Sequence, residues 1–164
     1  MREDEPKDAY QAIGQFSGWV ANADTKAGLL ATATTLLGGG LASQRHTIRD
    51  AFRPSSLADW VSLVAISVAM VAILVTAIAL VLVLVPRARV ARQTRFSRFS
   101  WPAVAAKSMD ELLAEVDAKP AEEAWWTARD LAIIVHRKVR WLRVALFGWV
   151  IGALGLLAWV VVLK

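Results

Sequence analysis

Cysteine is absent from the 164-residue chain. This absence excludes disulfide bonds, thiolate catalysis and cysteine-based zinc sites, although it leaves the cellular compartment open. Proline and glycine are also sparse, with 5 and 9 residues, which excludes collagen-like and low-complexity chains. The class of the protein must therefore be inferred from its apolar and charged residues.

Charged residues are few, at 20% of the chain, whereas hydrophobic residues make up 57%. Soluble domains usually contain about 45–50% apolar residues, and here the excess is concentrated in three long uncharged runs. This pattern excludes a simple soluble globule and an intrinsically disordered chain. It predicts an all-α integral membrane protein with three transmembrane helices and a small cytoplasmic helical portion.

The three runs cover residues 27–44, 60–86 and 144–163. The first is the least apolar and reaches about 27 Å as a helix, slightly less than a hydrocarbon core of ~30 Å. We expect the following organisation: an N-terminal amphipathic helix over residues 1–25, transmembrane helices over residues 26–44, 60–86 and 144–164, a short external loop over residues 45–59, and a basic cytoplasmic helical region over residues 87–143.

The distribution of Lys and Arg sets the orientation. The segment before the first run and the segment between the second and third runs together hold 15 of these residues, and the opposite face holds four. The positive-inside rule therefore places the N-terminus in the cytoplasm and the C-terminus on the opposite side of the membrane. The acidic stretch before the first run disfavours a cleaved signal peptide.

The segment before the first run has the periodicity of an amphipathic helix, with apolar residues at Tyr10, Ile13, Phe16 and Val20. Asn22 and Asp24 are suited to cap the helix that follows, because their side-chain oxygens accept bonds from free backbone N–H groups. A helix boundary is expected there, where the chain meets the membrane.

A heptad pattern precedes the third run and continues into it. Its members are Ala128, Ala132, Val135, Val139, Leu142, Leu146 and Trp149. No helix breaker interrupts the pattern, so we predict one long helix from about Ala121 into the third span. This apolar seam requires a packing partner, either another helix of the chain or a second subunit.

Catalytic and metal-binding residue sets are missing. Neither His46 nor His136 has a partner at metal-ligand spacing. The Gly38–Gly40 triplet lacks the lysine of a phosphate loop, and no nucleophile elbow occurs. The sequence predicts a protein that is not an enzyme and that holds no cofactor and no metal.

Basic residues on the cytoplasmic side are suited to hold phosphate. Arginine forks near a membrane bind lipid headgroups, and the same forks suit a nucleotide phosphate, so the residue type leaves both interpretations open. No nucleic acid is expected as a partner, because the bilayer accounts for the basic charge. The candidate phosphate contacts are Arg87, Arg92, Arg95, Arg137, Lys138 and Arg140.

Small residues recur at four-residue spacing in two of the spans. Such spacing lets helices approach closely, either within the chain or in a homo-oligomer. The expected packing positions are Ala31, Thr35 and Gly39 in the first span, and Gly148 and Gly152 in the third.

Two strings carry a family resemblance. They are WVANADTKAGLL over Trp19–Leu30 and DLAIIVHRKVRWLRVAL over Asp130–Leu146. With the strong second span between them, they make the chain resemble the Pycsar effector transmembrane family of bacterial anti-phage systems. Asp24, Thr25 and Lys26 match the motif of that family, and Lys138 matches a basic position before the last span.

The resemblance implies a membrane effector controlled by a cyclic pyrimidine nucleotide, cyclic CMP or cyclic UMP, made by a partner cyclase. Activation would impair the inner membrane and stop phage replication, an abortive infection. The chain has no room for a separate nucleotide-binding domain, so either a partner or the small cytoplasmic helical portion senses the nucleotide. The alternative from the residues alone is a constitutive membrane scaffold or assembly module acting through the heptad helix.

Overall fold

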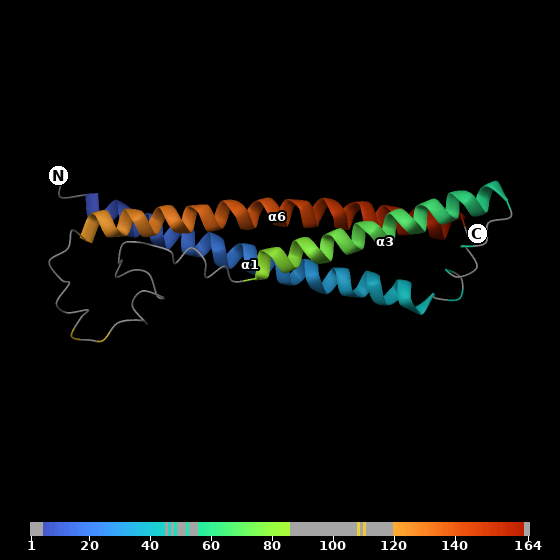
Figure 1. Cartoon of the computed structure of the whole chain (residues 1–164), viewed down its shortest axis with the longest axis horizontal. Helices are drawn as coiled ribbons and strands as arrows, with labels where there is room; N and C mark the ends of the chain where they lie inside the picture. Colours follow the sequence, from blue (N-terminus) through green and yellow to red (C-terminus); the bar gives the residue numbers. More distant parts are fainter. Residues whose placement is uncertain are drawn as a thin grey trace. The chain divides into compact units, whose positions relative to one another are not determined.

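The computed structural model describes residues 5–44, 46, 48, 52, 56–85, 108, 110 and 120–162. Within these ranges the chain forms three long helices (Figure 1), which are α1 over Glu5–Ser43, α3 over Leu57–Leu84 and α6 over Pro120–Val162. The prediction of an all-α protein is confirmed for the described part of the chain.

Local chemistry accounts for where α3 and α6 begin. The backbone N–H of Asp59 donates to Oγ of Ser56 at 3.2 Å, and the backbone N–H of Ser56 donates to Oδ2 of Asp59 at 2.8 Å. This reciprocal pair is a capping box, which satisfies donors that the first turn of a helix leaves free. The α6 helix begins with Pro120, whose missing N–H costs nothing at a first helical position.

The α1 helix is continuous through Asn22 and Asp24. The expected boundary at these two residues is therefore wrong. The segment around them contains no proline and is rich in alanine, the best helix former, so nothing in the backbone favours a break over continued hydrogen bonding.

The α6 helix runs without interruption for 43 residues. This confirms the predicted continuous helix from about Ala121. At 1.5 Å per residue α6 is about 64 Å long, roughly twice the thickness of a hydrocarbon core. The Leu57–Leu84 helix and the Ala121–Val162 stretch of α6 are the two helices that are long and apolar enough to cross a membrane.

The chain divides into two compact units. Unit 1 comprises Met1–Ala23 and Val85–Lys138, and unit 2 comprises Asp24–Leu84 and Val139–Lys164. In the described part of unit 1, the buried apolar side chains on both helices are small, apart from Val135. They are Ala9 and Ala23 on α1, and Ala121, Ala124, Ala128 and Val135 on α6.

The core of unit 2 is formed by all three helices. Its buried cluster consists of Ala27, Ala79, Leu80, Val83 and Ala145. Partly buried side chains pack around this cluster: Leu30 and Ala31 from α1, and Trp141 and Leu142 from α6. The second half of α1 therefore packs with the two apolar helices rather than standing apart from them.

The α3 and α6 helices approach most closely at three glycines. A Cβ added at Gly148 would lie 3.2 Å from the carbonyl oxygen of Ala72, and one at Gly155 would lie 3.2 Å from the carbonyl oxygen of Ala65. At Gly152, the same atom would meet Ile73 Cγ1 at 3.3 Å. A side chain at any of these positions would crowd α3, and such small residues let helices pack closely in a membrane.

The heptad seam on α6 shifts by one residue within unit 2. Leu146 is 52% exposed, whereas Ala145 is fully buried, so the expectation for Leu146 is wrong. A straight helix repeats every 3.6 residues and drifts away from a strict seven-residue pattern. The small side chains of Ala145, Gly148 and Gly152 mark the face that can approach α3 most closely.

Candidate functional site

The outward surface of unit 2 is apolar. Large side chains on α3 and α6 that would be buried in a soluble protein are exposed here, including Leu74 at 60% and Phe147 at 69%. Contiguous apolar surface of this extent on two adjacent helices is typical of a surface that faces lipid rather than water. The exposed surface of unit 2 is therefore suited to association with a bilayer.

Polar side chains inside this unit find partners on the backbone. Thr76 is fully buried, and its Oγ1 lies 2.8 Å from the carbonyl oxygen of Ala72 and 3.3 Å from that of Ala145. Its hydroxyl thus donates to its own helix and is shared with α6. In hydrocarbon, where water offers no alternative partner, such a bond between helices stabilises their contact.

The threonines of α1 are satisfied in the same way. Oγ1 of Thr34 donates to the carbonyl of Leu30 at 2.7 Å, and Thr32 and Thr35 donate to carbonyls four residues earlier at 3.1 and 3.0 Å. A threonine bonded to its own helix presents mainly its methyl group outward. The cost of exposing α1 to lipid is therefore lower than its composition indicates.

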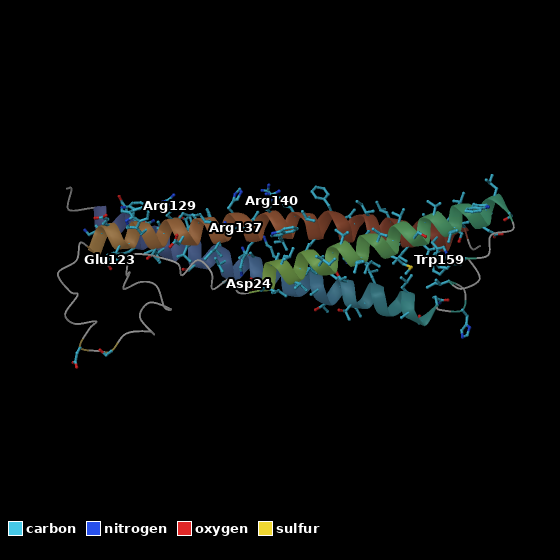
Figure 2. All side chains as sticks on the ribbon, viewed as in Figure 1. Asp24, Glu123, Arg129, Arg137, Arg140 and Trp159 are labelled. Carbon is cyan, nitrogen blue, oxygen red and sulfur yellow. The ribbon has the colours of Figure 1, made fainter. Side chains whose placement is uncertain are left out.

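The predicted motif Asp24, Thr25 and Lys26 lies on α1, at the start of the part that belongs to unit 2. Asp24 is half-buried, whereas Thr25 and Lys26 are exposed. On α6, Lys138 is the last residue of unit 1, and Arg140 belongs to unit 2. Figure 2 shows Asp24 on α1 and Arg140 projecting from α6 at the same end of unit 2.

The candidate phosphate contacts fall into three places. Arg137 is exposed and Lys138 half-buried in unit 1, and Arg140 is exposed in unit 2. Arg87, Arg92 and Arg95 lie outside the described residues.

The predicted helix-packing positions differ in whether they contact another helix. Gly148 and Gly152 contact α3, and Ala31 packs against the core cluster of unit 2. Thr35 is exposed, and a Cβ added at Gly39 would meet nothing within 4 Å.

The structure adds residues in unit 1 that the sequence did not single out. The guanidinium carbon of Arg129 lies 5.4 Å from the ring centroid of Trp126, within the range of a cation–π contact. Partial burial raises the pKa of the neighbouring Asp130 carboxyl above its ordinary value, and the attraction of Arg129 opposes this only in part. The three-residue spacing of Trp126 and Arg129 on one helix could have indicated their contact. Nothing in the sequence indicates the desolvation of Asp130.

Metal chemistry finds no support in the described ranges, where no group of three or more His, Cys, Asp or Glu side chains could hold an ion. Three buried polar atoms of unit 2 lack a hydrogen-bond partner among the described residues, namely Ser62 Oγ, Trp149 Nε1 and Trp159 Nε1. They lie on the two apolar helices and are not grouped with a titratable side chain.

These features define a helical protein with two helices long and apolar enough to span a membrane, one of which, α6, has a basic and aromatic first half. Residues 8–164 match the Pycsar effector protein domain, and the chain belongs to this family. Membership assigns it to cyclic-nucleotide-signalled anti-phage defence, in which a partner cyclase supplies a cyclic pyrimidine nucleotide. No curated protein and no solved structure matches the chain.

Proposed function

We propose that this chain is a bacterial inner-membrane effector whose three helices cross the bilayer and which impairs the membrane when a cyclic pyrimidine nucleotide appears. The observation that carries the proposal is the shared core of unit 2, in which Ala27 of α1, Val83 of α3 and Ala145 of α6 pack together. A helix that packs on two lipid-facing helices enters the bilayer with them.

The threonine hydrogen bonds support α1 as the third crossing. In hydrocarbon an unsatisfied hydroxyl costs several kcal/mol, on the order of the gain from burying one large apolar side chain. Because Thr32, Thr34 and Thr35 donate to their own helix, this cost does not arise on α1. The polar composition of the run is therefore compatible with a span.

Unit 1 is the proposed cytoplasmic sensor. A cyclic nucleotide carries one negative phosphate and one aromatic base, which require a cation and a stacking or apolar surface. Unit 1 offers Arg137 and Lys138 for the phosphate, with the exposed apolar side chain of Ile133 one turn before Arg137 on the same helix. Asp24, Thr25 and Lys26 are proposed to link sensing to the membrane helices, as the family motif implies.

The experiment that tests this function is membrane integrity in cells. The chain is co-expressed with a cyclase that makes cyclic CMP or cyclic UMP, and entry of a membrane-impermeant dye is followed. We expect dye entry with the active cyclase and none with a catalytically inactive cyclase.

Two outcomes contradict the proposal. Dye entry without any cyclase would show an intrinsically disruptive protein that a partner restrains. Absence of dye entry with both cyclases, with the chain present in the membrane fraction, would favour the scaffold alternative.

A further inference from the structure

The described cations of unit 2 all lie at one end of it. They are Lys26 on α1 and Arg140 and Arg143 on α6, and all three are exposed. Ala27 and Ala145, close neighbours of Lys26 and Arg143 in the chain, both belong to the buried cluster that also contains Val83 near the end of α3. The three cations therefore lie at the same end of one core, on two of its three helices, and we refer to them together as the cationic ring.

The cationic ring borders the apolar surface directly. Val144 follows Arg143, and Leu29 lies three residues after Lys26; these apolar side chains are 37% and 69% exposed. Long basic side chains in this position extend their apolar stems along the hydrocarbon and place their charges among the headgroups. The ring thus marks the level of the lipid–water boundary on unit 2.

In the described part of unit 2, acidic residues are fewer than the cations of the cationic ring at this end. In the described part of unit 2 the acidic residues are Asp24 and Asp59. Asp59 lies 24 residues before Val83 on α3, which is about 36 Å along the helix axis and hence at the opposite end. At the end of unit 2 that carries the cationic ring, its described residues therefore include one acidic residue, the half-buried Asp24, and three exposed cations.

We propose that the cationic ring binds the phosphate groups of anionic phospholipids. Arginine guanidinium groups match phosphate oxygens with two parallel hydrogen bonds, and an anionic headgroup has no cation of its own to repel the ring. The continuous apolar surface beside the ring offers a place for acyl chains, which favours a lipid over a free phosphate. This inference rests on the proposed insertion of unit 2 in the bilayer.

The test compares lipids that differ only in headgroup charge. The purified full chain in neutral detergent is titrated with phosphatidylglycerol or with phosphatidylcholine of the same acyl chains, and the bound lipid is counted by native mass spectrometry. We expect the anionic lipid to bind on the order of tenfold more tightly. The double variant Lys26→Gln/Arg143→Gln should lose this preference.

The matched control is Lys7→Gln/Arg129→Gln. It also removes one exposed lysine from α1 and one exposed arginine from α6, but both lie in unit 1. We expect this variant to keep the preference. An equal loss in both double variants would overturn the proposal, because it would show attraction by net charge alone.

Further outcomes separate the remaining explanations. Wild-type protein that binds the two lipids equally overturns the inference, as does displacement of phosphatidylglycerol by millimolar inorganic phosphate. If the Gln variant does not fold, the charge-conserving Lys26→Arg/Arg143→Lys should keep the preference, and its loss in a helical protein also overturns the inference. Carbonate extraction of cells measures separately whether the chain stays in the membrane. Release of the chain would contradict the proposed function. A chain that stays in the membrane but shows no preference for anionic lipid would contradict only lipid binding by the cationic ring.

Discussion

Oγ1 of Thr76 on α3 lies 2.6 Å from the position that a Cβ at Gly148 on α6 would occupy. A side chain at position 148 would therefore collide with the hydroxyl of Thr76. The same hydroxyl donates to the carbonyl oxygen of Ala145 at 3.3 Å. This hydrogen bond therefore depends on the absence of a side chain at position 148.

The first prediction concerns this contact. Gly148→Ala should lower the free energy of unfolding by about 1–3 kcal/mol, because the new methyl group forces the helices apart and weakens the Thr76 bond. Thermal unfolding in detergent, followed by circular dichroism, measures the loss. Gly39→Ala is the control, since its Cβ would meet nothing within 4 Å and alanine favours a helix. Equal destabilisation by the two substitutions would contradict the assigned contact.

A second prediction concerns the crossing of α1. Because the chain has no cysteine, single introduced cysteines report accessibility without background. In spheroplasts, a membrane-impermeant maleimide should label Gln44→Cys from outside, should label Gln11→Cys only after permeabilisation, and should label Thr32→Cys poorly in both. External labelling of both Gln11→Cys and Gln44→Cys in intact spheroplasts would show that α1 does not cross.

A third prediction follows from the raised pKa of Asp130. A carboxyl group with a higher pKa in the folded state binds its proton more tightly there, so stability falls as pH rises from 3.8 through the raised pKa. Asp130→Asn removes this dependence. The free energy of unfolding of the variant minus that of the wild type should therefore be larger at pH 7 than at pH 4, by less than about 1 kcal/mol. A constant difference across this range would contradict the shift.

The fourth prediction concerns the motif. Asp24→Asn and Lys26→Gln should each abolish protection against phage in cells that carry the cyclase, with normal amounts of protein in the membrane fraction. Asn22→Ala is the control, because Asn22 is exposed on the same helix and outside the motif. Full protection by both motif variants would separate these residues from the proposed function, and plating efficiency is the measurement.

The sequence predicted the helices well where a long run of uncharged residues is enough to require a helix. The second uncharged run and the long C-terminal helix correspond to α3 over Leu57–Leu84 and α6 over Pro120–Val162, because a long apolar run with internally bonded backbone has no stable alternative in lipid. The predicted helix boundary near Asp24 was wrong, since the alanine-rich, proline-free segment around it continues the backbone hydrogen bonding of α1.

The interior of unit 2 was less predictable. Gly148 and Gly152 stood out by spacing, whereas the close approach at Gly155 and the burial of Ala145 depend on the register between α3 and α6. The contact of Arg129 with Trp126 and the desolvation of Asp130 likewise arise from the packed structure. Spacing along one helix gives its faces but not the rotation with which it meets another.

The contact between α3 and α6 is formed largely by alanine and glycine, which lose no side-chain rotamer freedom when they pack. The contact is therefore stabilised by dispersion between closely packed backbones, and its formation costs little side-chain conformational entropy. The three glycines meet α3 at successive turns, and the hydroxyl of Thr76 bonds to the carbonyl of Ala145 beside them. A shift of α6 along α3 by one residue would bring side chains into these contacts, so the glycine positions fix the register of the pair.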